Sequence, residues 1–306
     1  MSTTTYTPYL DRYYNPYTRP VLIGTGVLFI FIPILSVGFR FYARSLSSAK
    51  RGIDDWITIP SMVICIGLSI TQVIATTVGG LGTHQILVNG QLAHTEQLYV
   101  YEKTKYVCEL LGTIGLWVIK LSVLLFYRRI FSVRAFRIVN NIFIGLTVSW
   151  GIAFTFTVAF QCTPVSTLWD KFETDYGPYC IKIQPSSFAL AISDLILDAL
   201  ILVIPMPHVC RLNMPWRQKI AVAGMLLLGS VVVAIGITRA MIFSWVVSFT
   251  AAEPLVYFKD ITWYSAGANF WHLAENVVGL LGCCLPTYGP AFRGFLRKRP
   301  GAGSQK

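Results

Sequence analysis

Seven runs of about twenty apolar residues each are the feature of the sequence that most limits its possible folds. A bilayer hydrocarbon core about 30 Å thick takes about 20 residues to cross as an α-helix. The runs are continuous rather than alternating, which argues against a membrane β-barrel, and a helix satisfies its own backbone hydrogen bonds, as lipid requires. The sequence therefore predicts an all-α integral membrane protein, a bundle of seven transmembrane helices. The expected spans are Val21–Phe41, Trp56–Val78, Tyr106–Tyr127, Val139–Phe160, Phe188–Val209, Ile220–Val246 and Ile261–Cys284.

The composition agrees with burial in lipid. Of 306 residues, 54% are hydrophobic and 13% are charged, whereas a soluble domain carries about 25% charged residues. The formal net charge of +11 would suggest a nucleic-acid partner only if the basic residues formed one face of a folded soluble domain. They lie between the apolar runs instead, so the expected partner is the lipid bilayer and no nucleic acid is expected.

The distribution of lysine and arginine among the loops predicts the orientation. Alternate loops, at residues 40–51, 128–137, 211–219 and 293–306, hold 16 of the 25 basic residues, the opposite loops hold seven, and two lie inside spans. Because cytosolic loops carry the excess of Lys and Arg, we expect the N-terminus outside and the C-terminus in the cytosol. The predicted domains are a short extracellular segment at 1–19, a seven-helix membrane domain at 20–292 and a short basic cytosolic tail at 293–306.

Three of the seven cysteines lie at or beyond the expected outer boundary, where oxidation to a disulfide is permitted. A bridge between Cys162 and Cys180 would fix the loop after the fourth span over the outer mouth of the bundle. The alternative is a bridge from Cys108 to Cys180, which would tie the third span to that loop.

Ionisable residues inside the expected spans are the main functional signal, since a charge in hydrocarbon is costly unless it is paired or hydrated. Asp194 and Asp198 are four residues apart and share one face of the fifth span. Arg239 lies at a depth similar to that of Asp194, so these two are expected to pair. Glu275 and Asp198 lie near mid-membrane, with Lys120 within reach of either. The predicted polar core comprises Glu109, Lys120, Asp194, Asp198, Arg239, His272 and Glu275.

Four acids face two bases in this polar core. Because burial disfavours the charged form of a carboxylic acid, either one acid is protonated or a cation or basic ligand group compensates it. One interpretation is a site for a ligand or an ion. The other is a polar network that only fixes the register of the helices, and the sequence leaves both open.

Several chemistries lack the residues they need. A retinal pigment requires a lysine in the seventh span, and Lys259 precedes that span. His208 lies at the cytosolic edge of the fifth span, which leaves His272 as the one histidine in the interior of the expected spans, too few for an intramembrane zinc site. No cofactor and no metal are therefore expected. If the protein is an enzyme, Asp198 or Glu275 would serve as a proton donor in an apolar cavity.

Short motifs along the chain, each weak alone, occur together in one order. This ordered set resembles the fungal rhodopsin-like domain family, the receptor-like seven-helix membrane proteins of filamentous fungi, over roughly residues 25–295. The motifs are Arg40-Phe-Tyr-Ala-Arg44, Asp54-Asp55-Trp56, Gly80-Leu-Gly-Thr-His84, Lys120 to Phe131, Gln161-Cys162-Thr-Pro164 with Trp169 and Cys180, Ser193-Asp194 leading to Pro205 and Pro207, Thr238-Arg239, and Trp271-His-Leu-Ala-Glu275-Asn-Val-Val-Gly279.

The resemblance implies a multi-pass protein of the plasma membrane or an endomembrane. Some members of the family look like G-protein-coupled receptors, and others are encoded among genes of secondary metabolism. The leading hypothesis is a receptor-like protein that senses a small apolar or amphipathic ligand from the outer side, with Tyr127, Arg128 and Arg129 facing a cytosolic G protein. The alternative is a membrane-embedded enzyme, such as a cyclase, or a transport helper in a secondary-metabolite pathway, using Asp198 and Glu275. A purely structural membrane protein is the third reading.

Overall fold

The computed structural model describes residues 16–46, 52–85, 87–88, 91–92, 95–131, 133–170, 179–207 and 216–288. Most of the predicted extracellular segment at 1–19 and the whole predicted tail at 293–306 lie outside these residues, as do parts of the basic loops.

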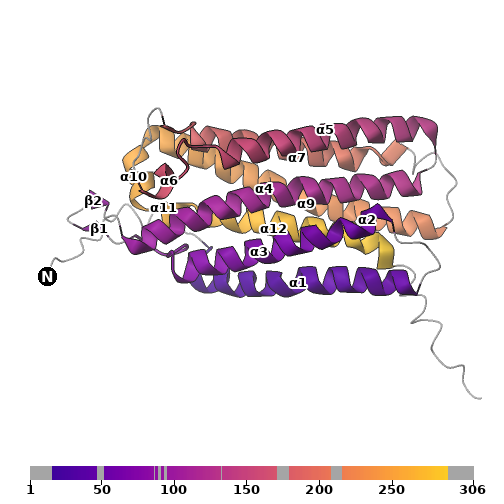
Figure 1. The fold of residues 1–306 in the computed structure, drawn as a ribbon, viewed down its shortest axis with the longest axis horizontal. Coiled ribbons are helices and arrows are strands. Elements are labelled where there is room, and N and C mark those ends of the chain that lie inside the picture. Colours follow the sequence, from indigo (N-terminus) through magenta and orange to yellow (C-terminus); the bar gives the residue numbers. More distant parts are fainter. Residues whose placement is uncertain are drawn as a thin grey trace, which may run out of the picture.

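Long α-helices lying side by side make up most of the described chain (Figure 1). Short elements connect them, and the described strands are two antiparallel pairs of residues. The long helices are α1 (Arg19–Ser45), α3 (Thr58–Thr77), α4 (Glu96–Ile130), α5 (Arg134–Ala159), α7 (Ile183–Val203), α9 (Trp216–Ala252) and α12 (Ala266–Cys284). The short elements are α2 (Ile53–Trp56), β1 (Leu87–Val88), β2 (Gln91–Leu92), α6 (Thr167–Asp170), α10 (Pro254–Lys259), α11 (Ile261–Tyr264) and a 3-10 turn at Leu285–Tyr288.

Six helical stretches in the described part of the chain are long and apolar enough to cross a membrane, and they contain α1, α3, α4, α5, α7 and α9. α12 is not among the six, because Asn269, His272, Glu275 and Asn276 lower its hydropathy. Its position is nevertheless inside the bundle, where it contacts α1, α3, α4 and α9. The polar residues of α12 thus lie on a helix that is surrounded by other helices of the bundle.

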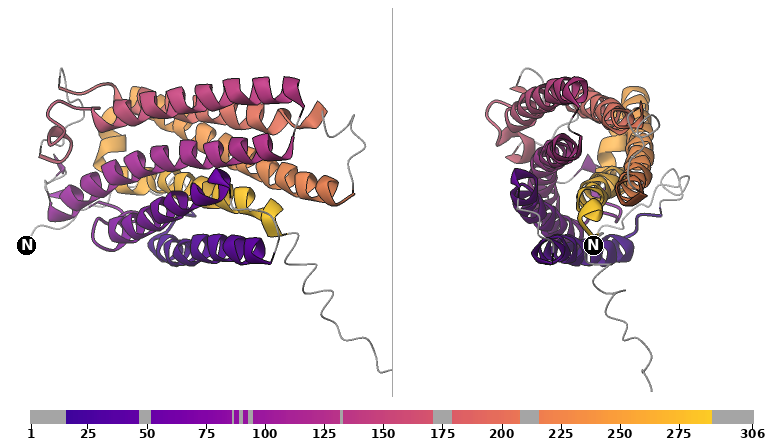
Figure 2. Two further views of the ribbon diagram at one scale, coloured as in Figure 1. Left: turned by 45° about the vertical axis from the view of Figure 1, so that its right-hand side comes forward. Right: turned by 90° about the vertical axis from the view of Figure 1, so that its right-hand side faces the viewer.

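The seven long helices close into a ring, which the end-on view in Figure 2 shows. Neighbours in the ring are α1 and α3, α3 and α4, α4 and α5, α5 and α7, α7 and α9, α9 and α12, and α12 and α1. A further contact between α4 and α12 crosses the interior, so the space inside the ring is divided by these two helices.

Glycines on α4 allow α12 to approach closely. A Cβ atom on Gly112 would lie 2.4 Å from Nε2 of His272, and one on Gly115 would lie 2.2 Å from Oδ1 of Asn276. Both distances are far below van der Waals contact. The polar side chains of α12 therefore fit against α4 only because these two positions lack a side chain.

The outward faces of the helices are apolar. Leu35 of α1 is 69% exposed, Ile142 of α5 is 63% exposed and Leu227 of α9 is 69% exposed. A soluble monomer rarely exposes contiguous apolar surface on this scale. The buried residues, by contrast, include many polar and charged side chains, the inverse of a water-soluble globule.

The bundle has two distinct ends. β1, β2, α6, α10 and α11 lie together at one end, called here the hairpin end (Figure 1). A disulfide joins Cys162 and Cys180 there, which is the first of the two predicted pairings, whereas Cys108 is a buried free thiol. The opposite end carries Arg40, Arg44, Arg128 and Arg129 and is called the arginine end.

The predicted bounds of three spans are wrong in informative ways. α4 begins at Glu96, capped by the Thr95 side chain, which accepts from Leu98 N at 3.2 Å. Glu102, Lys103 and Lys105, predicted to lie in a loop or at its edge, are therefore helical.

Similarly, Arg40 and Arg44 were counted with the first cytosolic loop and lie in α1 instead. The stretch 261–284, predicted as one span, is broken at Ser265 between α11 and α12. In the first two cases charged residues ended the apolar run before the helix itself ended or began, whereas in the third the helix breaks inside the run.

Candidate functional site

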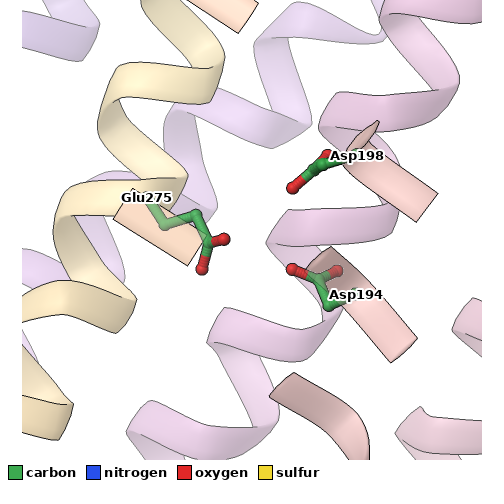
Figure 3. Close-up of side chains that lie close together, drawn as sticks. All are labelled: Asp194, Asp198 and Glu275. Carbon is green, nitrogen blue, oxygen red and sulfur yellow. The ribbon is translucent and has the colours of Figure 1, made fainter. Parts of the chain in front are cut away.

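Five charged side chains from four helices meet in the middle of the bundle. We call them the central charge cluster: Lys120 of α4, Asp194 and Asp198 of α7, Arg239 of α9, and Glu275 of α12. Their side chains are between 0% and 11% exposed. In Figure 3 the three carboxylates, which come from two facing helices, point toward one another.

Asp194 is the centre of this cluster because it binds both bases. Its Oδ1 lies 2.9 Å from Nζ of Lys120, and its Oδ2 accepts from Nη2 of Arg239 at 2.9 Å. The structure thus brings together Asp194 and Arg239, the pair expected from their matching depth.

The outer members of the cluster each bind one base. Lys120 Nζ lies 2.8 Å from Oδ1 of Asp198, and Arg239 Nη1 contacts Oε2 of Glu275. Lys120, expected within reach of Asp198 or Glu275, binds Asp198 and also Asp194, while Glu275 pairs with the arginine. The helices α4, α7, α9 and α12 are therefore linked by one continuous set of ion pairs.

The remaining two predicted residues of the polar core, Glu109 and His272, lie toward the hairpin end. Glu109 Oε1 accepts a long hydrogen bond from Ser187 Oγ at 3.4 Å. The buried Nε2 of His272 has no hydrogen-bond partner in the described part of the chain and lies against Gly112. Neither side chain makes an ion pair with the central charge cluster among the described contacts.

Glu109 and His272 line a chamber between the cluster and the hairpin end. It consists of two adjoining cavities of about 40 and 20 Å³ that share Glu109, Ser187, Phe243 and His272. Arg239 lines the smaller cavity, so the cluster forms the floor of this hairpin-end chamber. Tyr257 of α10 lies in the wall of the larger cavity, and burial raises its pKa to about 12, which keeps its hydroxyl protonated.

A second cavity, of about 70 Å³, lies on the other side of the cluster and is called the arginine-end cavity. Lys120, Asp198 and Glu275 line it where it meets the cluster, and Tyr127 lines it toward the arginine end. The rest of its wall is apolar or glycine: Leu116, Ile119, Val123, Ile201, Leu202, Gly229, Val232, Gly279 and Gly282. The charged layer therefore separates a polar chamber from an apolar cavity.

The three acids of the cluster also have the geometry of metal ligands. Asp194, Asp198 and Glu275 each offer a carboxylate oxygen within 4.8 Å of the others. Lys120 and Arg239 already bind these carboxylates, so the positive charge that a divalent metal would bring is largely supplied by the protein itself.

A second set of ion pairs, at the arginine end, was not predicted as a unit. Arg40 is fully buried and donates from Nε to Asp55 Oδ1 at 3.0 Å and from Nη2 to Asp54 Oδ2 at 3.1 Å. Arg44 binds the same two carboxylates, and Arg129 Nη1 donates to Asp54 Oδ1 at 3.1 Å. This arginine–aspartate network ties α1, α2 and α4 together.

The sequence contains a pattern that indicates this arginine–aspartate network. Arg40 and Arg44 are four residues apart and share a helix face, and the adjacent acids Asp54 and Asp55 open the next helical segment. Two bases on one helix end facing two acids on the next are expected to pair. Assigning the arginines to a loop concealed this relationship.

The arginine end of α4 differs from the predicted partner-facing surface. Tyr127 is 3% exposed and packs in a core with Phe131 and Phe136, because an aromatic ring is stabilised more by burial than by contact with water. Arg129 is engaged by Asp54. Of the three residues expected to face a partner, Arg128 is exposed and makes no ion pair among the described residues.

A family model and several relatives match the chain. The model described as fungal rhodopsin domain matches residues 39–294. The chain is 30% identical over 286 residues to the "Polyenoic acids biosynthesis gene cluster protein Ba17b" of Metarhizium anisopliae, covering 90% of this chain and 74% of that protein. No solved structure matches the chain significantly.

Two more relatives are matched by this chain over only about half of their own length. A "SAT4 family membrane protein" of Emericella nidulans is 28% identical over 72% of this chain and 52% of its own length. "Receptor GIN3" of Arthrobotrys oligospora is 24% identical over 67% of this chain and 48% of its own length. The chain thus spans about half the length of these two proteins.

The resemblance predicted from the ordered motifs is confirmed, since the family model covers more than four fifths of the chain. The six apolar helices and the membrane-protein relative together identify a multi-pass membrane protein. The chain belongs to the fungal rhodopsin domain family.

Proposed function

We propose that the protein is a receptor-like membrane protein with seven spans, in which the hairpin-end chamber binds a small amphipathic ligand from outside the cell or from an organelle lumen. α12 is the seventh span. The hairpin end faces outward and the arginine end faces the cytosol.

Two features support this orientation. The disulfide between Cys162 and Cys180 lies at the hairpin end, and disulfides persist on the oxidising side of a membrane. Counted along the sequence, residues 40–51, 128–137, 211–219 and 293–306 hold 16 of the 25 basic residues, and such an excess is typical of the cytosolic flanks of membrane helices. Both features favour the same side for the same end.

The observation that carries the receptor proposal is that the chamber and the central charge cluster are built by the same four helices. α4, α7, α9 and α12 each contribute residues to the chamber wall and an ion-pairing residue to the cluster beneath it. Arg239 belongs to both. A ligand that displaces Arg239 would change the ion pairs that join the four helices, which is how a binding event becomes a change in helix packing.

The chamber wall suits an amphipathic ligand. Glu109, Gln184, Asn269 and His272 offer polar groups, and Nε2 of His272 has its hydrogen-bonding capacity unused. Phe243 and other apolar side chains complete the wall. Polar groups that converge beside apolar side chains orient a small molecule with both polar and apolar parts.

One relative supports the receptor reading by its name, "Receptor GIN3". In this proposal the cytosolic surface includes Arg128, which is exposed at the end of α4, and the partner is a G protein. Tyr127 is excluded from that surface by its burial.

A second candidate function is a membrane enzyme or transport helper in a secondary-metabolite pathway. It is favoured by the relative encoded in a polyenoic acid biosynthesis gene cluster and by the arginine-end cavity, where Asp198 and Glu275 meet an apolar wall. An acid at the end of an apolar cavity is the arrangement that protonation of a hydrocarbon substrate requires.

Deletion of the gene, followed by complementation with point variants, separates the two functions. The receptor proposal predicts that deletion abolishes a cyclic-AMP or transcriptional response to the organism's own medium extracts, without accumulation of one biosynthetic precursor. Glu109→Gln should fail to restore the response, whereas Glu102→Gln, a nearby buried acid outside the chamber, should restore it. Accumulation of a single precursor with unchanged signalling would instead support the second candidate.

A further inference from the structure

The central charge cluster contains one more acid than base. Asp194, Asp198 and Glu275 face Lys120 and Arg239, so with all five ionised the cluster carries one excess negative charge. Each of the five side chains is at least 89% buried. An excess charge in such a place is strongly unfavourable unless something compensates it.

The excess negative charge can be assigned to particular carboxylate oxygens. Of the six carboxylate oxygens, Asp198 Oδ2 and Glu275 Oε1 are buried and make neither a hydrogen bond nor an ion pair with any described residue. Glu275 is the more informative of the two because its side chain is 0% exposed. A buried carboxylate oxygen without a partner is rare in folded proteins and calls for a specific explanation.

Both residues open into the arginine-end cavity. Asp198 and Glu275 line it from α7 and α12, whereas Asp194 and Arg239 do not. In Figure 3 the carboxylates of Asp198 and Glu275 face each other across a gap, with Asp194 beside them. The cavity of about 70 Å³ has room for roughly five waters, at 10–15 Å³ each.

We propose that Asp198 and Glu275 bind one monovalent metal cation, Na⁺, at the cluster end of the arginine-end cavity. The charge count selects a monovalent ion, because one positive charge neutralises the cluster and a divalent ion would overcharge it. Hard cations are bound by carboxylate and water oxygens at about 2.3–2.6 Å. Carboxylate oxygens within 4.8 Å of one another can therefore contact the same ion, with waters in the cavity completing its shell.

This site is independent of the hairpin-end chamber. It would join α7 to α12, which no ion pair among the described residues links directly: Asp198 is held by Lys120 of α4, and Glu275 by Arg239 of α9. A bound ion would hold these two helices together and stabilise the bundle.

The test is thermal unfolding of the purified full-length protein in detergent or nanodiscs. NaCl is varied at constant ionic strength against the chloride of N-methyl-D-glucamine, a cation too bulky for the cavity. The unfolding midpoint should rise saturably with Na⁺, by about 3–5 °C at ten times the dissociation constant. Sodium-23 NMR should detect bound Na⁺ under the same conditions.

Variants identify the site. Glu275→Gln and Asp198→Asn should each abolish the Na⁺ response, and Glu275→Gln should unfold in N-methyl-D-glucamine at a temperature no lower than the wild type, since it removes the excess charge. Glu102→Gln, which removes a buried carboxylate of α4 outside the cluster, should keep the response. Because Asp198→Asn alters one ion pair and Glu275→Gln another, the conclusion stands if one of them fails to fold.

Three outcomes would overturn the proposal. An equal rise with both cations would show a general ionic effect. A wild type that responds to neither cation would show that a proton or a protein group neutralises the cluster. A Na⁺ response that survives in both Glu275→Gln and Asp198→Asn would place the ion elsewhere.

Discussion

Arg239 of α9 donates a 2.9 Å hydrogen bond to Asp194 of α7, in the middle of a bundle where both side chains are at most 1% exposed. Lys120 binds the other oxygen of the same carboxylate. Asp194 is therefore shared by two cations, and this sharing determines how the bundle should respond to substitution.

Asp194→Ala should destabilise the protein far more than Asp198→Ala, although the two residues are one helical turn apart. The first change breaks two buried ion pairs, leaving Lys120 only Asp198 and Arg239 only Glu275, and breaking a buried pair typically costs about 3–5 kcal/mol. The second breaks one contact at a side chain that is 11% exposed. Fluorescence-detected size exclusion of tagged variants measures the folded fraction, and equal losses for the two variants would contradict the arrangement.

Exchanging the charges of the pair, with Asp194→Arg combined with Arg239→Asp, should not rescue folding. The introduced guanidinium would lie beside Lys120, since Asp194 contacts that residue at 2.9 Å, and like charges in a buried site repel. Restoration of folding by the exchange would show that Lys120 does not depend on Asp194. The same size-exclusion assay gives the answer.

At the arginine end, each arginine-to-alanine substitution should lower the stability by an amount that depends on how deeply that arginine is buried. All three arginines carry the same charge. Arg40→Ala should cost about 3–5 kcal/mol because it removes the most deeply buried partner of Asp54 and Asp55, and Arg44→Ala, at 12% exposure, should cost less. Arg128→Ala is the control and should cost less than about 1 kcal/mol, as expected for an exposed charge. Thermal midpoints in detergent rank the three variants, and a similar cost for all three would refute the buried network.

The close packing of α4 against α12 predicts that one added methyl group is harmful at Gly115 and harmless at Gly145. A Cβ at Gly115 would lie 2.2 Å from Asn276 Oδ1 and 3.1 Å from Ile64, while one at Gly145 meets no atom within 4 Å. Gly115→Ala should lower the thermal midpoint, and Gly145→Ala should leave it unchanged or raise it slightly, as alanine favours a helix by up to about 1 kcal/mol. Equal behaviour of the two variants would mean that α12 lies farther from α4.

The disulfide gives a prediction for mass spectrometry. Non-reducing peptide mapping should find Cys162 joined to Cys180 and Cys108 as a free thiol. Cys162→Ala with Cys180→Ala should destabilise the protein by about 3 kcal/mol, the value for a closed loop of this length, whereas Cys108→Ala should not. A Cys108 cross-link would disprove the pairing.

The proposed orientation can be tested with reporter tags. A tag at the N-terminus should be accessible outside the cell or in the exocytic lumen, and a tag at residue 306 should be reachable only after the cytosolic side is opened. A tag inserted after α9 and one after α12 should fall on opposite sides, because α12 is proposed to cross. If both tags lie on the same side of the membrane, α12 does not cross it. The protein then has six spans, and its C-terminus lies on the outer side.

The features that could be predicted from the sequence are those that depend on local composition. Six of the apolar runs correspond to apolar helices, since hydropathy is summed over neighbouring residues. The contact of Asp194 with Arg239 could be expected because depth follows from counting residues along a helix at 1.5 Å each.

What the sequence did not predict depends on the rotation of each helix about its own axis. The partner of Glu275 is Arg239 rather than Lys120, a choice set by which faces of α9 and α12 turn inward. Arg40 looked like a residue that faces water, because a charge at the end of an apolar run usually does. Its burial rests on Asp54 and Asp55 across a turn, which no count of loop charges includes.

The polar character of α12 determines the order in which the protein can be made. The side chain of His272 fits only because Gly112 lacks a Cβ atom, and that of Asn276 fits only because Gly115 lacks one. The carboxylate of Glu275 pairs with the guanidinium of Arg239. All three partners are translated earlier, on α4 and α9. In the proposed seven-span arrangement, α12 delivered alone to a bilayer would place these groups in hydrocarbon, which is costly. Its integration would therefore follow the assembly of α4 and α9, which supply the partners of its polar side chains.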